Sequence, residues 1–183
     1  MRSMLWSAMV VAAVSFGCAT TMAPATTPPV SARTLPAHLR TFVGTWDTTS
    51  EFQTEPGGPM QQSKGTAVGR NMGQPWVVLE HTGNHFGTPF SAVLAIGHDV
   101  QKGEYSGVWF DSLSSNVARY QGTVDATGQV LTLVTHVPVE QGATQEIREV
   151  IEVKSDDHIV LTTRAQAGAE WITVVTAHYR RRK

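Results

Sequence analysis

One segment of the sequence places a single carboxylate among regularly spaced apolar residues. Between Gln145 and Val153, the residues Ile147, Glu149 and Ile151 alternate with a mostly charged set. This two-residue period is typical of a strand with one buried face. Glu149 would then point into an apolar interior, where an isolated carboxylate is costly unless it is paired, hydrogen-bonded or protonated. A carboxyl group in such a place can donate or accept a proton near neutral pH.

Three other residues could complete a site with Glu149. Arg119 or His136 could pair with the carboxylate, and Asp111 faces the same interior if the odd positions of its strand point inward. Such a cluster could orient a small ligand. It could also supply an acid and a base, with Glu149, Asp111 and His136 as the candidate catalytic residues. The alternatives are a buried structural ion pair and, for Asp111, a role in starting a turn.

Aromatic residues supply the apolar part of the candidate site. Trp76, Phe90 and Trp109 lie in separate apolar segments and are predicted to face the interior. Together with Arg119 and Glu149, they are the predicted ligand-binding residues. A lumen walled by aromatic side chains with a few polar groups is typical of a small-molecule site.

Other chemistry has weak support in the sequence. His81 and His85 have a spacing that unites two side chains on one face of a helix, but this segment is predicted to be a strand end and a loop. The seven histidines are therefore expected to be a scattered surface set, and no metal site is predicted. The sequence contains neither a Gly-x-Ser-x-Gly elbow nor a phosphate-binding glycine loop.

These residues must be positioned by strands. Ten short segments are rich in Val, Thr, Ile and aromatic residues, and most gaps between them contain Gly, Asp or Asn. The segments are residues 42–52, 62–72, 76–82, 90–98, 105–111, 117–124, 130–138, 145–153, 158–164 and 170–180. Hairpin-sized gaps without a helical period predict an all-β, antiparallel up-and-down meander. Closure of about ten strands into a single barrel would remove the edges of this sheet.

Both ends of the predicted domain carry a family resemblance. Gly44-Thr45-Trp46 resembles the Gly-x-Trp signature of lipocalin and calycin barrels, and Tyr179-Arg180-Arg181 resembles their closing strand. In those folds an arginine packs over the signature tryptophan, as a planar guanidinium can. The resemblance implies structural roles for Gly44, Trp46 and Arg180.

The wider pattern resembles the bacterial "domain of unknown function 1579" family over about residues 40 to 182. The segments that carry it are Gly44–Trp46, Pro56–Pro59, Ser63–Ala67, Gly87–Phe90, Trp109–Ser112 and Arg148–Val150. It implies a lipocalin-like β-barrel, often in exported proteins, with no established activity. Nitrobindin-type barrels resemble this architecture and hold haem through one histidine, which makes His178 the candidate haem ligand in a minor hypothesis.

The first 37 residues are predicted to lie outside the barrel. Residues 1–17 contain an uncharged apolar run that is short for a membrane span and typical of a signal peptide. A small residue directly precedes Cys18, which resembles the site at which bacterial lipoproteins are cleaved and acylated. The alternative is ordinary cleavage a few residues later, with loss of Cys18. Residues 18–37 are predicted to be a Pro/Thr-rich tether, and residues 38–183 the barrel domain.

Composition excludes some classes of function and of covalent structure. Lys plus Arg total 14 against 15 for Asp plus Glu, so no basic footprint for nucleic acid is expected. One cysteine excludes an intramolecular disulfide. We expect an exported barrel, lipid-anchored in the outer membrane or free in the periplasm of a Gram-negative bacterium, that binds a small apolar or amphipathic molecule. The alternatives are an acid–base isomerase or cyclase and a structural envelope protein with a filled barrel.

Overall fold

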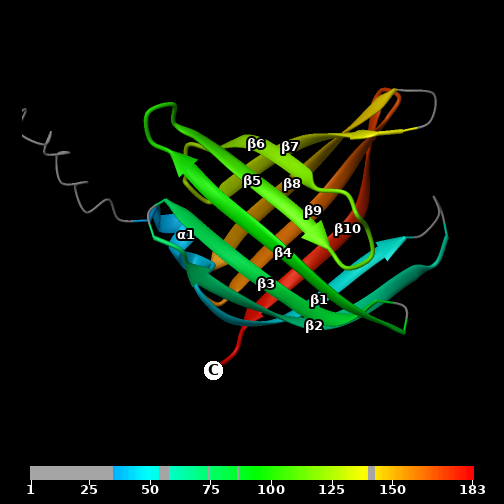
Figure 1. The fold of residues 1–183 in the computed structure, drawn as a ribbon, viewed down its shortest axis with the longest axis horizontal. Helices are drawn as coiled ribbons and strands as arrows, with labels where there is room; N and C mark the ends of the chain where they lie inside the picture. The colour runs from blue at the N-terminus through cyan, green and yellow to red at the C-terminus, as the bar shows by residue number, and fades with distance from the viewer. Residues whose placement is uncertain (1–34, 54–57, 74, 86, 140–142) are drawn as a thin grey trace, which may run out of the picture. The chain divides into compact units, whose positions relative to one another are not determined.

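The structure is a computed structural model that describes residues 35–53, 58–73, 75–85, 87–139 and 143–183. The described residues form ten antiparallel strands that close into one barrel, together with one short helix (Figure 1). The predicted signal peptide, Cys18 and most of the predicted tether lie outside the described residues. None of the described helical residues forms a helix long and apolar enough to cross a membrane.

Each strand pairs with its neighbours in the chain, and β1 also pairs with β10. The elements are α1 Ala37–Thr41, β1 Gly44–Gln53, β2 Met60–Asn71, β3 Trp76–His85, β4 Thr88–Asp99, β5 Glu104–Asp111, β6 Ala118–Val124, β7 Val130–Pro138, β8 Thr144–Ser155, β9 His158–Ala167 and β10 Glu170–Arg181. The predicted all-β, up-and-down barrel of ten strands is confirmed, because closure gives every strand two partners.

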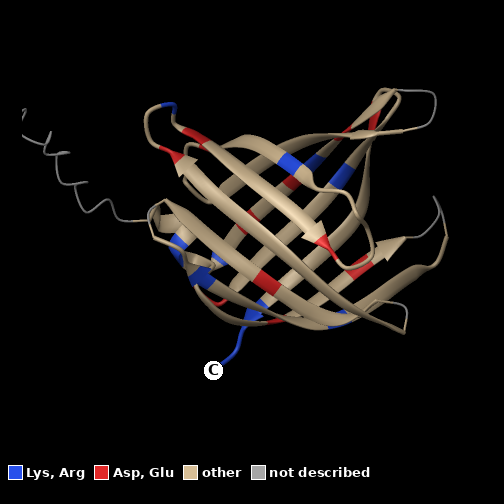
Figure 2. Cartoon of the chain, viewed as in Figure 1, with Lys and Arg blue, Asp and Glu red and all other residues tan. Residues whose placement is uncertain are grey.

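Alternation along the strands separates the interior from the surface. Val77 and Leu79 of β3 are buried and lie opposite Ile96 and Leu94 of β4. Trp76, Val78 and Glu80, which alternate with them on β3, are more exposed, as expected when successive side chains point to opposite faces of a sheet. Lys and Arg are interspersed with Asp and Glu over the strands and loops of the barrel (Figure 2).

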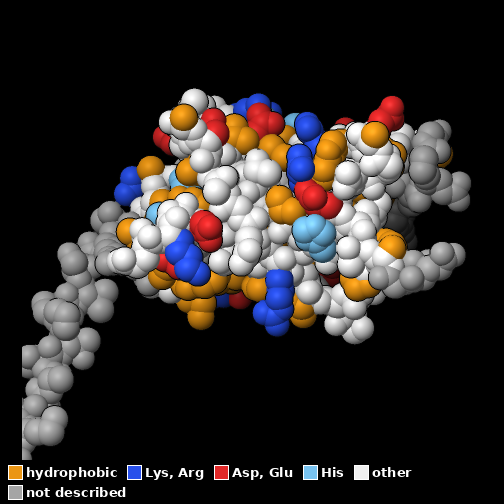
Figure 3. All heavy atoms as spheres, turned by 90° about the horizontal axis from the view of Figure 1, so that it is seen from above, with side chains coloured by type: hydrophobic (Ala, Val, Ile, Leu, Met, Phe, Trp, Pro, Cys, Tyr) orange, Lys and Arg blue, Asp and Glu red, His pale blue; other side chains and the backbone are white. Residues whose placement is uncertain are grey.

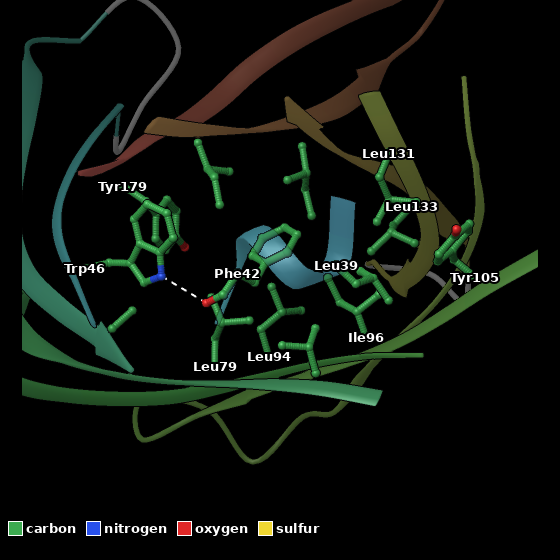
Figure 4. Close-up of a cluster of buried hydrophobic side chains, with 14 of the residues drawn as sticks. Leu39, Phe42, Trp46, Leu79, Leu94, Ile96, Tyr105, Leu131, Leu133 and Tyr179 are labelled. Atoms are coloured by element: carbon green, nitrogen blue, oxygen red, sulfur yellow. Dashed lines mark hydrogen bonds between the residues drawn. The ribbon is translucent and has the colours of Figure 1, made fainter. Parts of the chain in front are cut away.

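The helix α1 packs against the core at one end of the barrel. Leu39 is fully buried, and Leu35 and Phe42 are 3% and 2% exposed. Figure 4 shows Leu39 and Phe42 within the cluster of buried side chains contributed by the strands. The sequence pattern does not reveal this helix, because five residues are too few for a helical period. Leu35, predicted to belong to the tether, is part of the buried core.

An arginine packs over Trp46 at the end of the barrel that contains α1, but it is Arg181 and not the predicted Arg180. The Arg181 guanidinium lies 4.2 Å from the centre of the Trp46 ring. It donates hydrogen bonds of 2.8 Å to the carbonyl oxygens of Thr41 and Val43. Arg180 is exposed, because from Val175 onward the odd positions of β10 point inward and the even positions point outward.

Gly44 and Trp46 take the structural positions that the family resemblance implied. Gly44 has a φ of +132°, and a Cβ atom there would lie 2.4 Å from Nη1 of Arg181. The indole N–H of the fully buried Trp46 donates to the carbonyl oxygen of Phe42 at 2.9 Å (Figure 4). These contacts join β1, α1 and the end of β10 into one closed end.

Candidate functional site

The lumen of the barrel contains a cavity of about 410 Å³. Its walls are largely apolar and aromatic, and they include Phe52, Phe90, Leu94, Trp109, Leu133 and Ile151. Leu113 and Ser114, in the loop after β5, also line it, so the cavity reaches the end of the barrel opposite α1. This volume lies within the range of small-molecule sites in proteins.

Two facing glycines expose backbone to this cavity. Gly65 of β2 lies opposite Gly83 of β3, and both line the cavity. A Cβ atom on Gly65 would lie 2.4 Å from the carbonyl oxygen of Thr82, and one on Gly83 would lie 2.9 Å from that of Lys64. The two strands approach too closely here for larger residues.

Glu149 lines the cavity, as its strand pattern predicted. It lies between Leu133 of β7 and Thr163 of β9. The Thr163 hydroxyl donates to Oε2 at 2.8 Å, and the Tyr120 hydroxyl donates to Oε1 at a longer 3.4 Å. Burial raises the pKa of Glu149 to about 7, so its protonated and ionised forms are both populated at neutral pH.

A second polar pair lines the same cavity. The Tyr179 hydroxyl lies 3.0 Å from Nε2 of His81, and both residues are buried. Burial lowers the pKa of His81 to about 4, so its ring is neutral at physiological pH. Burial, followed by the charge of Glu149, raises the pKa of Tyr179.

Aromatic side chains and Asp111 form the part of the wall near the opening. Phe90 stacks on Trp109 with ring centres 6.4 Å apart, and the indole N–H of Trp109 donates to Asp111 at 2.9 Å. The other carboxylate oxygen of Asp111 accepts the backbone N–H groups of Leu113 and Ser114. Asp111 therefore starts a turn, one of the alternatives predicted for it, and also lines the cavity.

Three residues predicted to face the lumen are on the outer surface instead. Trp76 is 39% exposed, Arg119 is exposed beside the inward Tyr120, and the His136 side chain lies 3.9 Å from Glu146 on the exterior. The prediction was wrong because a shift of one residue moves a strand side chain to the other face. Charged side chains of both signs and histidine are exposed on the face drawn in Figure 3.

The histidines are arranged differently from the prediction. His178, the candidate haem ligand, lies outside the lumen, where its Nδ1 is 3.1 Å from Nε2 of His158. His81 and His85 both line the cavity, because residues four apart on a strand share a face. The described residues contain no cluster of three or more His, Cys, Asp or Glu that could hold a metal ion.

Three further polar residues of the lumen were not predicted: Tyr120, Thr163 and Tyr179. Strand alternation carries a signal for two of them: Thr163 has the parity of the inward Leu161, and Tyr179 that of Ala177. The resulting set combines an apolar wall, a carboxylate that titrates near neutral pH and neutral hydrogen-bonding groups. It can hold a small molecule by its apolar body and orient one polar group.

Comparison with known proteins shows the fold and the family. The barrel is similar to the crystal structure of Rv2717c from M. tuberculosis, with a TM-score of 0.57, 14% identity and coverage of 82% of this chain and 100% of that chain. It is also similar to the S-type phycobiliprotein lyase CPES from Guillardia theta, with a TM-score of 0.53, 12% identity and coverage of 79% and 90%. No curated protein sequence matches.

The family is identified by the sequence itself. The model of the family described as "Protein of unknown function (DUF1579)" matches residues 33–181, which include the whole barrel and α1. This match confirms the resemblance that the motifs indicated. The chain therefore belongs to the DUF1579 family.

Proposed function

We propose that the barrel binds one small, largely apolar or amphipathic molecule in its lumen. The observation that carries this proposal is the cavity of about 410 Å³, which is walled by aromatic and aliphatic side chains and contains Glu149. Burying apolar ligand surface against such walls stabilises a complex by roughly 25 cal/mol per Å² before the cost of association. The cavity also argues against the alternative of a barrel filled by its own side chains.

The arrangement favours an amphipathic ligand over a purely apolar one. Phe90 and Trp109 offer stacked rings near the opening. Glu149 and the His81–Tyr179 pair offer hydrogen-bonding groups in the same cavity. A purely apolar ligand would leave these polar groups without water and without new partners, which costs binding free energy.

The proposed setting is the bacterial cell envelope. The predicted signal peptide and the cysteine at position 18 support this location, and both lie outside the described residues. The mass of the mature protein tests it. A mass that corresponds to a chain beginning at an acylated Cys18 supports a lipid anchor, cleavage after Cys18 supports a periplasmic form, and an uncleaved chain contradicts export.

A second candidate function is acid–base catalysis in the same cavity. The observation in its favour is that Glu149, Asp111 and the His81–Tyr179 pair all line one cavity, and no arginine among the described residues forms an ion pair with Glu149. A carboxyl group with a pKa of about 7 can transfer protons at neutral pH. The phycobiliprotein lyase of similar fold is named as an enzyme, so catalysis is compatible with this architecture.

The two candidates differ in what happens to the bound compound. A binding protein returns the same molecule that it took up, whereas an isomerase or cyclase releases a changed one. Comparison of the compounds released by the wild-type protein and by Glu149→Gln after the same exposure distinguishes them. Identical compounds support binding alone, and a product seen only with the wild-type protein supports catalysis.

Binding in the lumen is tested with the neutral fluorophore N-phenyl-1-naphthylamine. Val175 of β10 lines the cavity and its neighbour Thr176 does not, so Val175→Trp fills the lumen and Thr176→Trp is the matched control. We expect saturable fluorescence enhancement with the wild-type protein and the control, and its loss in Val175→Trp. Enhancement that is the same in both variants would place the dye elsewhere and contradict the proposal.

A further inference from the structure

We infer that the lumen selects a molecule with one positive charge, such as a protonated amine on an apolar or aromatic body. This inference rests on the proposed function, because it assigns the class of ligand that the same cavity takes. Its basis is geometric: Glu149 offers a carboxylate to the cavity, and no cationic side chain among the described residues is paired with it.

The described groups that surround Glu149 are uncharged at neutral pH. They are Tyr120 of β6, Leu133 of β7, Thr163 of β9, Tyr179 of β10 and, hydrogen-bonded to Tyr179, His81 of β3. The tyrosines stay protonated because burial raises the pKa of each, and His81 stays neutral because burial lowers its pKa. The other carboxylate on the cavity, Asp111, adds negative charge.

The cations closest to Glu149 along the chain and across the sheet are on the exterior. Arg148 precedes Glu149 but points outward, where it pairs with Glu146 and lies 3.9 Å from the centre of the Trp171 ring. Arg164, opposite Arg148 on β9, is exposed. Lys64 borders the cavity but is exposed, and it alternates with the inward Ser63. A cationic ligand would therefore meet no like charge beside Glu149.

Glu149 keeps hydrogen-bonding capacity for a ligand. Each carboxylate oxygen can accept two hydrogen bonds, and each accepts one from a protein hydroxyl. The N–H groups of an amine can use the remaining positions. The faces of nearby aromatic rings, including Trp109, attract cations as well. A neutral hydroxyl could use the same acceptor positions without the charge attraction, and an anion would be repelled.

The charge on Glu149 couples this binding to pH. Burial raises its pKa to about 7, and a bound cation favours the ionised form, so binding releases a proton in slightly acidic solution. Amine affinity therefore rises as the pH increases through 7. If only ionised Glu149 binds the cation, the affinity at pH 5 is lower by about a hundredfold, two pH units below the pKa.

Three probes with one body and different charges test the inference. They are 4-phenylbutylamine, 4-phenylbutanol and 4-phenylbutyrate, and their affinities are measured by titration calorimetry at pH 7.5 and pH 5. The proteins are the wild type, Glu149→Gln, and Glu152→Gln, in which the lost carboxylate belongs to the same strand but pairs with Lys154 outside the barrel. N-phenyl-1-naphthylamine is included as the neutral lumen probe.

At pH 7.5 we expect the amine to bind the wild-type protein at least tenfold more tightly than the alcohol, and the acid most weakly. Glu149→Gln should lose this preference, and Glu152→Gln should keep it. Lowering the pH to 5 should weaken amine binding to the wild-type protein at least tenfold and leave alcohol binding unchanged. The comparison of the two pH values uses only the wild-type protein, so it tests the inference even if Glu149→Gln does not fold.

The failures of the inference and of the proposed function give different results. Equal affinities for amine and alcohol, an amine preference that survives in Glu149→Gln, or amine binding that does not change with pH would overturn the inference while lumen binding stands. Binding of the neutral fluorophore without measurable binding of the amine would do the same. Absence of binding by all four compounds would overturn the proposed function as well.

Discussion

Replacing Glu149 by glutamine should stabilise the protein above neutral pH. Burial raises the pKa of this carboxyl group from 4.5 to about 7. The unfolded chain therefore ionises Glu149 at a lower pH than the folded protein does. Between these two pKa values the folded protein binds more protons, and its free energy of unfolding decreases as the pH rises. One pKa unit corresponds to about 1.4 kcal/mol, so the full difference is about 3 kcal/mol.

The comparison is made by chemical denaturation from pH 5 to pH 8.5. At pH 5, folded Glu149 is protonated, and both it and the glutamine that replaces it can accept a hydrogen bond from one of the two hydroxyls of Thr163 and Tyr120 and donate one to the other. Because the unfolded chain already ionises Glu149 in part at this pH, the two stabilities should agree to within about 1 kcal/mol. At pH 8.5 the variant should be more stable by about 2–3 kcal/mol, since water in the open cavity reduces the full value. Glu152→Gln, on the outer face, should show no such gain.

Two histidines contribute pH dependence of the opposite sign. Burial lowers the pKa of both His38 and His81 to about 4, so the unfolded chain binds more protons between that value and 6.5. Stability is therefore lost as the pH falls through this window. Because the wild-type protein and Glu149→Gln share both histidines, the difference between their stabilities isolates Glu149. If the difference in stability between the two proteins stays constant from pH 5 to pH 8.5, burial does not raise the pKa of the Glu149 carboxyl group, and the reasoning is wrong.

Two further predictions concern the closed end of the barrel. Arg181→Ala should reduce the free energy of unfolding by about 2–3 kcal/mol, because it removes a cation–π contact and charge-assisted hydrogen bonds to three carbonyl oxygens. Denaturation of the adjacent variant Arg180→Ala, expected to change stability by about 0.5 kcal/mol or less, provides the control. Leu39→Ala should reduce the free energy of unfolding by about 2–4 kcal/mol, because it leaves a void in place of a fully buried side chain of α1. If this variant unfolds at the same denaturant concentration as the wild-type protein, the helix does not support the core.

The fold was predictable because its signals are local. Segments rich in β-branched and aromatic residues alternate with turn residues such as Asp125–Gly128, and the structure has a strand in each of the ten places. The side-chain alternation of β8 is also local, so it predicts that Glu149 faces the lumen without any knowledge of the strands that pair with β8. Closure followed from the cost of unpaired sheet edges.

The rest of the site depends on information that local patterns do not contain. His81 and Tyr179 are 98 residues apart and meet only because the pairing of β1 with β10 closes the barrel and leaves just two strands, β1 and β2, between β10 and β3. Trp76 and His136 were assigned to the wrong face although both lie in strands that were predicted correctly, because the sequence alone does not show which of the two faces of each strand points inward. The register shift between Thr173 and Val175 adds a further interruption that spacing alone does not reveal.

The central claim is that the lumen is a binding site, and native mass spectrometry of the protein purified from the cells that make it tests this most directly. The wild-type protein should carry a single small molecule that is released on unfolding, and Val175→Trp, purified in the same way, should lack it. A wild-type protein of bare polypeptide mass, or the same bound mass on both proteins, would contradict the claim.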